Sequence, residues 1–91
     1  MAELGFGIIG AGAICPLHIA AVENCPGARL VAVADRNEER SRAIGDEKGI
    51  RWYNDHRVLL SDPEVDIVCV CTPSGTRAPI CIDAARAGKH I

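Results

Sequence analysis

The 91-residue sequence predicts an α/β fold in which a doubly wound parallel sheet is covered by helices on both faces. Three observations predict this fold. Short apolar runs alternate along the chain with segments that carry the apolar spacing or the capping residues of helices. The apolar runs are continuous, as is typical of strands that are buried on both faces. Glycine, proline and asparagine separate the segments. Such a chain folds with right-handed crossovers into an order β-α-β-α-β-α-β-α-β.

The composition excludes several classes of protein. With 48% hydrophobic and 24% charged residues, the chain is ordinary for one globular domain and not for a disordered segment. A net charge of -2 argues against general binding of nucleic acid. The segment from Leu4 to Val22 is uncharged, but its bunched glycines, Pro16 and His18 argue against a membrane helix. The start also lacks the basic region of a signal peptide.

The cysteines point to a reducing compartment. There are five, an odd number, and no two have the CxxC spacing, so the sequence predicts neither a disulfide framework nor a metal site. Cys69 and Cys71 lie two apart in an apolar run and would face the same side of a strand as small core residues. This usage predicts a cytoplasmic protein.

The first predicted unit is a strand, a turn and a helix. Residues Leu4 to Ile9 form a short apolar run, and Gly10-Ala11-Gly12 follows as a turn. From Ile14 the spacing becomes helical, and Pro26-Gly27 ends the helix. The expected buried stripe of this helix is Ile14, Leu17, His18, Ala21, Val22 and Cys25.

The middle of the chain predicts a second and a third strand. Residues Leu30 to Ala34 are the second, and Asn37 caps the helix that follows, which Gly45 weakens and Gly49 ends. Residues Arg51 to Tyr53 are a short third strand. One helical turn, from Arg57 to Leu60, precedes Ser61-Asp62-Pro63.

The last unit contains the clearest strand, from Asp66 to Cys71. A loop, Thr72 to Gly75, leads to a helix that we expect to be capped by Thr76, with Pro79 in its first turn, and to end near Ala87 before Gly88. His90-Ile91 then opens another strand. The sequence thus predicts a Rossmann-type doubly wound sheet that is truncated at the start of its fifth strand.

The first turn carries two glycines of a dinucleotide-binding fingerprint. Gly10 would allow the tight turn, and Gly12 would let the backbone approach a pyrophosphate, which a helix N-terminus attracts. Cys15 stands where a third Gly or an Ala is usual, but it is small. A glycine-rich turn without a ligand is the alternative. The intervening helix and the acid described next favour nucleotide binding.

Asp35 ends the second apolar run, at about the spacing of 20 residues expected for the acid that binds the adenosine ribose. The alternative is a solvated aspartate at a strand end. Arg36 beside it could stack on adenine or hold a 2′-phosphate, which Asp35 would repel. We therefore expect NAD as the cofactor, with NADP possible.

The end of the central strand supplies a third candidate segment, Cys71-Thr72-Pro73-Ser74. Ligands of doubly wound sheets lie beyond the carboxyl ends of the strands, at the point where the strand order reverses. We expect these residues to border the nicotinamide half of the cofactor. The alternative is a polar connection with no contact to ligand.

These segments together resemble the N-terminal domain of the glucose–fructose oxidoreductase/inositol dehydrogenase/MocA (Gfo/Idh/MocA) family. The resemblance covers nearly the whole chain, in the family's order. The matching segments are Gly7 to Ile14 with His18, Val31 to Arg36, Leu60 to Asp66, Thr72 to Gly75, and Ala84 to Ile91.

The resemblance implies hydride transfer between NAD(P) and a secondary alcohol of a sugar, cyclitol or related polyol. It implies that the pyrophosphate is contacted by Gly10, Gly12, Ala13 and Ile14. It also implies that Asp35 and Arg36 face the adenosine ribose. Thr72, Pro73 and Ser74 would lie near the nicotinamide half. Arg77 stands where the family usually has a His and is kept as a cofactor-binding candidate.

The resemblance also implies that residues 1–91 are the dinucleotide-binding part of a two-domain, homo-oligomeric oxidoreductase whose substrate domain is absent. The family's Glu-Lys-Pro motif, with its candidate catalytic Lys, would follow the strand at His90. We therefore expect no catalytic residue in this chain and no turnover by it alone. A nucleotide-sensing regulatory module and a non-catalytic interaction domain are the alternative functions.

Other reactive side chains are expected to be structural. His18 lies on the apolar stripe of its helix and is expected to be packed rather than catalytic. His56 and His90 have no acidic or thiol neighbour at ligand spacing and are expected to be ordinary surface or strand residues. A thiolate at Cys15, near a helix N-terminus, is the less favoured alternative to simple packing.

Overall fold

The computed structural model describes residues 3–10, 12, 15–72 and 74–91, with only the backbone described at positions 15 and 74. It contains one parallel sheet with the strand order β3-β2-β1-β4. The strands are β1 (Leu4–Ile9), β2 (Ala28–Ala34), β3 (Arg51–Tyr53) and β4 (Ile67–Val70). The predicted fold class is confirmed, and the strand order reverses between β1 and β4.

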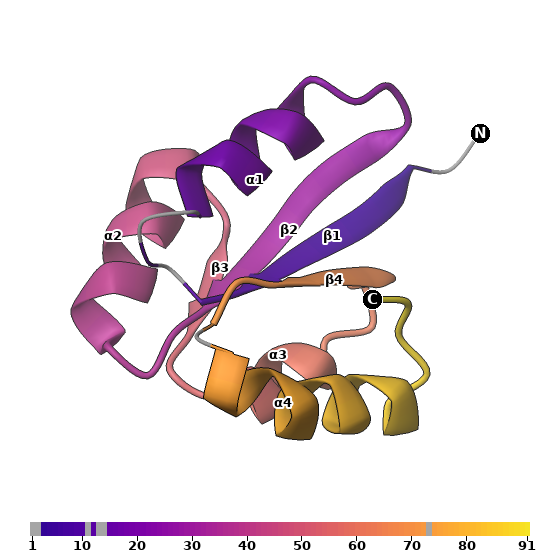
Figure 1. Ribbon diagram of the computed structural model, residues 1–91. Coiled ribbons are helices and arrows are strands. Elements are labelled where there is room, and N and C mark those ends of the chain that lie inside the picture. The colour runs from indigo at the N-terminus through magenta and orange to yellow at the C-terminus, as the bar shows by residue number, and fades with distance from the viewer. Residues whose placement is uncertain (1–2, 11, 13–14, 73) are drawn as a thin grey trace.

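Helices cover both faces of the sheet, as Figure 1 shows. On one face lie α1 (Cys15–Glu23) and α2 (Glu38–Lys48). On the other lie α3 (His56–Leu60) and α4 (Ser74–Arg86). None of the described helices is long and apolar enough to cross a membrane.

The core is divided by the sheet into two parts. Ile8 packs with Ile19 and Val33 under α1 and α2, whereas the neighbouring Ile9 packs with Ala34 and the apolar residues of α3 and α4. Consecutive strand residues point to opposite faces, so each strand needs apolar residues at every position. This explains the continuous apolar runs of the sequence. Cys69 and Cys71 both pack against the part under α1 and α2, as predicted.

The predicted stripe of α1 is confirmed at Val22 and wrong at Leu17, Ala21 and Cys25. Ile19 and Val22 are buried against the sheet, His18 is half-buried, and Leu17 is 71% exposed. Ala21 and Cys25 are exposed as well, and position 14 lies outside the described residues. The helix is apolar around most of its circumference, so more than one stripe satisfies the helical spacing, and the spacing alone does not choose between them.

Gly45 does not weaken α2 but lets it approach the sheet. The helix continues through Gly45, where a Cβ atom would lie 2.6 Å from Cδ1 of Trp52 on β3. The predicted caps are confirmed. The Asn37 side chain accepts hydrogen bonds from the backbone of Glu39 and Arg40, and Gly49 ends the helix with a φ of 67°.

The start of α4 differs from the prediction. The helix begins at Ser74, so Thr76 is not its cap and Pro79 lies inside the helix rather than in its first turn. Pro79 has no N–H to donate to the carbonyl of Gly75, so one helical hydrogen bond is missing there. Gly88 follows the end of the helix with a φ of 77°, as predicted.

His90, where the sequence predicts that another strand opens, makes an isolated parallel bridge to the sheet. The bridge joins it to Ile67. The His90 carbonyl accepts a hydrogen bond of 2.8 Å from the Val68 N–H, and the His90 N–H donates one of 3.0 Å to the Asp66 carbonyl. This pairing extends the sheet order beyond β4, on the side away from β1.

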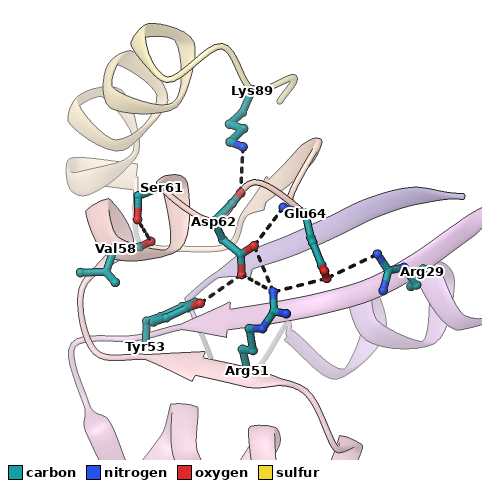
Figure 2. A network of polar contacts seen from close by, with 8 residues as sticks. All are labelled: Arg29, Arg51, Tyr53, Val58, Ser61, Asp62, Glu64 and Lys89. Carbon is teal, nitrogen blue, oxygen red and sulfur yellow. Dashed lines mark hydrogen bonds and ion pairs between the residues drawn. The ribbon is translucent and has the colours of Figure 1, made fainter. Parts of the chain in front are cut away.

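Asp62, between α3 and β4, is the centre of a polar network at the opposite edge of the sheet from the carboxyl ends of the strands (Figure 2). Its side chain is 2% exposed. It accepts hydrogen bonds from Arg51 Nη1 at 2.9 Å, the Tyr53 hydroxyl at 3.0 Å and the Glu64 N–H at 2.9 Å. The Lys89 Nζ donates to the Asp62 carbonyl at 3.0 Å. The Asp62 carboxylate therefore connects β3 with the segment before β4, and the Asp62 backbone carbonyl holds the chain after α4.

The environment of Asp62 favours its charged form. Burial opposes ionisation, but the hydrogen bonds from Glu64, Arg51 and Tyr53 outweigh it and hold the pKa of Asp62 below its usual value. Because the pKa is lowered by folding, the network stabilises the fold above the unfolded-state pKa of about 4. This stability is lost as the pH falls through the lower pKa of the folded state.

The substitution Asp62→Asn tests this network. We expect it to lower the free energy of unfolding at pH 7 by about 1–3 kcal/mol, because Arg51, Tyr53 and the Glu64 N–H lose a charged acceptor. The difference from wild type should shrink as the pH falls from about 4, where the carboxylate of the unfolded chain takes up a proton, toward the lower pKa of the folded state. Urea denaturation at several pH values measures both effects.

Asp46→Asn is the matched control, since the Asp46 side chain is 69% exposed and is paired only with Arg42 on its own helix among the described residues. It should change the stability by less than about 0.5 kcal/mol. Equal effects of the two substitutions would contradict the special role of Asp62.

Candidate functional site

A cavity of about 870 Å³ opens at the carboxyl ends of β1, β2 and β4. Because parallel strands end at one edge, residues far apart in the sequence meet there, and this edge is where ligands bind in open α/β sheets. The lining residues come from four places: the ends of the strands, the turns after them, α2 with the start of α3, and the first half of α4. They are Ile9, Gly10, Gly12, Ala34, Asp35, Arg36, Arg40, His56, Cys71, Thr72, Gly75, Thr76, Arg77, Pro79 and Ile80.

Most of the residues predicted to bind a cofactor meet at this cavity. Those that line it are Gly10, Gly12, Asp35, Arg36, Cys71, Thr72 and Arg77. Ala13, Ile14 and Pro73 lie outside the described residues. Ser74 begins α4, and only its backbone is described.

Gly10 is required where β1 leaves the sheet. Its φ is 103°, which side chains rarely adopt, and a Cβ atom would lie 2.9 Å from the carbonyl carbon of Cys71. The Gly10 N–H donates a hydrogen bond of 2.7 Å to the Ala34 carbonyl. The backbone at the end of β1 therefore contacts the ends of β2 and β4. Gly10, Ala34 and Cys71 all line the cavity.

Gly12 has the opposite environment. None of the described atoms lies within 4 Å of the position that its Cβ would take. A Cβ at Gly12 would therefore not touch the described protein, and Gly12 itself lines the cavity. The glycine leaves the backbone open to a ligand, as a pyrophosphate-binding turn requires.

Thr72 presents a polar atom that lacks a partner. Its hydroxyl oxygen is buried, and no hydrogen bond joins it to the described residues. A buried hydroxyl without a partner is unfavourable by about 1–3 kcal/mol. A polar ligand in the cavity would remove this penalty, so the open turn at Gly12 and the Thr72 hydroxyl both fit a bound nucleotide cofactor.

The end of β2 and the start of α2 bring one acid and two basic residues to the cavity. Asp35 is half-buried, and its Oδ1 accepts a hydrogen bond of 2.7 Å from the Asn37 N–H, which holds the carboxylate at the turn into α2. Arg36 and Arg40 are exposed and line the same end of the cavity. This end offers an acceptor for hydroxyl groups and two guanidinium groups for a base or a phosphate.

Arg77 has a structural contact in addition to lining the cavity. Its Nε donates a hydrogen bond of 2.9 Å to the carbonyl of Thr72, which joins the first half of α4 to the end of β4. Where the family usually has a His, this chain thus has a side chain that supports the turn beside Thr72.

The prediction missed several lining residues, among them Arg40, Thr76, Ile80 and His56. Helical spacing could have identified Ile80, because it lies one turn after the candidate Arg77 within α4. It does not link Arg40 to Arg36, because Arg36 precedes the cap of α2 at Asn37. His56 was expected to be an ordinary surface or strand residue, because the sequence has no acidic or thiol partner for it at ligand spacing. The structure instead places it, half-buried, at the start of α3 and at the cavity. Its Nε2 lies 2.9 Å from Oδ2 of Asp83, which α4 brings to it from 27 residues away.

Comparison with known proteins agrees with this architecture. Residues 4–91 match the family described as an oxidoreductase family with an NAD-binding Rossmann fold, GFO_IDH_MocA. Myo-inositol 2-dehydrogenase of Thermotoga maritima is 35% identical over 86 residues, which cover 93% of this chain and 26% of that protein. Inositol 2-dehydrogenase of Rhizobium meliloti is 39% identical over 88 residues, which cover 94% of this chain and 26% of that protein.

Solved structures give the same result. The myo-inositol dehydrogenase of Lactobacillus casei, in complex with NAD(H) and myo-inositol, aligns with a TM-score of 0.87 at 31% identity. The alignment covers 96% of this chain and 26% of that one. The chain therefore spans about a quarter of the length of these relatives. It belongs to the Gfo/Idh/MocA oxidoreductase family and is an NAD-binding Rossmann domain of that family.

Proposed function

We propose that this chain holds NAD along the cavity and serves an oxidoreductase that transfers a hydride to or from a secondary alcohol of a sugar, cyclitol or related polyol. The observation that carries the proposal is the meeting of the glycine turn, Asp35 and Thr72 at one edge of the sheet. The inositol dehydrogenases among the relatives support a polyol as the small-molecule substrate.

In this proposal each strand end holds one part of the cofactor. The backbone at Gly10 and Gly12, with Ala13 and Ile14, binds the pyrophosphate. Thr72 and Cys71, with Pro73, Ser74 and Arg77, border the nicotinamide half. The orphaned Thr72 hydroxyl then gains a hydrogen-bond partner. Bound NAD supplies the carbon that accepts the hydride, and the chain's own residues orient the cofactor and exclude water.

Asp35 sets the preference for NAD. The hydrogen bond from the Asn37 N–H to Oδ1 of Asp35 restricts the rotation of the carboxylate. In this proposal the carboxylate faces the adenosine ribose. A carboxylate accepts hydrogen bonds from ribose hydroxyls and repels a 2′-phosphate. Arg36 and Arg40 are placed to contact adenine, or the phosphate of NADP when that cofactor binds.

The rest of the reaction belongs to protein outside this chain. We propose a second domain that binds the substrate and supplies the group that moves the hydroxyl proton, and a homo-oligomeric parent protein that works in the cytoplasm. The support is the resemblance to the family and, for the compartment, the odd number of cysteines in the sequence and their lack of CxxC spacing.

Asp35→Asn tests the cofactor assignment. We expect the Kd for NAD to rise about tenfold or more, because a hydrogen bond to a charged group contributes about 1.5–3 kcal/mol. The Kd for NADP should rise less or fall, since the repelling charge is gone. Isothermal titration with both cofactors measures the ratio.

The asparagine oxygen can still accept from the Asn37 N–H, so the turn should be preserved. The control is Asp46→Asn, which replaces an exposed acid of α2. It should leave both Kd values unchanged. An unaltered NAD Kd in Asp35→Asn would remove Asp35 from the site.

Gly12→Val and Gly10→Ala separate the binding surface from the fold. Gly12→Val should raise the Kd for NAD by at least about tenfold, because the turn must approach the pyrophosphate, while the melting temperature stays near that of wild type. Gly10→Ala should destabilise the fold by about 1–3 kcal/mol, because its φ and the carbonyl of Cys71 both exclude a Cβ.

Thermal denaturation and cofactor titration of both variants check this pair of expectations. The assignment of Gly12 fails if the valine variant is folded and binds NAD as tightly as wild type.

A further inference from the structure

His56 is a cavity residue whose orientation is set by another helix. It begins α3 and lines the cavity, and its side chain is 25% exposed. Its Nε2 lies 2.9 Å from Oδ2 of Asp83 on α4. Because α3 and α4 lie on the same face of the sheet (Figure 1), this contact holds the imidazole between two helices at the cavity.

The partner of Nε2 decides what the other nitrogen can do. An ionised carboxylate only accepts hydrogen bonds, so Nε2 carries the proton in this contact. In the neutral ring, Nδ1 then keeps its lone pair and is an acceptor. The carboxylate of Asp55 lies 3.9 Å from Nδ1, too far for a hydrogen bond, and is bound instead by the backbone and guanidinium of Arg57.

The cavity that His56 lines has both apolar and polar residues in its wall. Ala34, Pro79 and Ile80 line it together with Asp35, where the proposed function places the adenosine ribose. A purine has two apolar faces and a polar edge, and adenine carries an amino group that donates on that edge. The apolar lining fits the faces of the base, and His56 supplies an acceptor at the wall.

We propose that His56, oriented by Asp83, accepts a hydrogen bond from the amino group of the adenine base and so makes the site selective for adenine over hypoxanthine. The inference rests on the proposed binding of NAD. It assigns recognition of the base to His56, which lies at the start of α3. His56 belongs to none of the three segments that the sequence predicted to bind the cofactor.

The test compares NAD with nicotinamide hypoxanthine dinucleotide, in which a carbonyl oxygen replaces the amino group. Wild type should bind NAD about tenfold more tightly, because the acceptor on His56 would face an acceptor in the analogue. His56→Phe keeps a flat ring but has no nitrogen. It should bring the two Kd values within about twofold of each other, chiefly by weakening NAD.

Two further variants complete the series. His90→Phe is the matched control, because His90 is exposed and is not among the cavity residues, and it should keep the wild-type ratio. Asp83→Asn should reduce the ratio, since its amide can donate to Nε2 and release the ring from one tautomer. Circular dichroism checks that each variant is folded, and His56→Ala replaces the phenylalanine variant if that one is not.

A second readout follows the imidazole itself. The chain has three histidines, so the ring Cε1–H signals are few in an NMR spectrum, and the signal lost in His56→Phe identifies His56. Adding NAD should shift this signal and leave that of His90 in place.

The possible failures are distinguishable. If folded wild type binds neither dinucleotide, the proposed function fails and the inference with it. If wild type binds NAD but His56→Phe keeps the preference for adenine, or the His56 signal does not move, the inference alone is overturned. An unchanged ratio in Asp83→Asn would overturn the role of Asp83.

Discussion

The approach of the Gly10 backbone to the carbonyl of Cys71 is the contact on which the site depends. It joins the end of β1 to the end of β4 across the point where the strand order reverses, and it leaves no room for a Cβ. Because Gly10 also donates to Ala34, the ends of β1, β2 and β4 are held in one arrangement. The turn toward Gly12, the carboxylate of Asp35 and the hydroxyl of Thr72 consequently open onto a single cavity.

The two edges of the sheet have different physical roles. At one edge the carboxylate of Asp62 is buried and its acceptors are used by Arg51, Tyr53 and Glu64, so polar groups are satisfied within the protein (Figure 2). At the other edge a buried hydroxyl has no partner among the described residues, and a glycine faces open space. The polar network at the start of the strands stabilises the fold, whereas the groups at the end of the strands are left available to a ligand.

Local signals predicted most of the fold. The strands, the caps at Asn37 and Gly49 and the parallel bridge at His90 depend on residues that are close in sequence. Errors arose where tertiary contacts decide. Gly45 looks like a helix breaker until Trp52 is placed beside it, and the apolar surface of α1 does not show which side meets the sheet.

The site was predictable to a similar extent and for similar reasons. Glycine spacing and an acid at a strand end identified Gly10, Gly12 and Asp35, because the chain itself fixes their separation. The pairing of His56 with Asp83 joins α3 to α4 across 27 residues, and no spacing rule connects them. It required the packing of two helices on one face of the sheet.

The most direct test of this account is to map backbone amide NMR shifts during titration with NAD. The account predicts that the largest changes occur at the carboxyl edge, at Gly10, Gly12, Asp35 and Thr72, while the amides of Asp62 and Glu64 at the opposite edge keep their positions. Saturable binding with the largest changes around Asp62, or no change at the glycine turn, would contradict it.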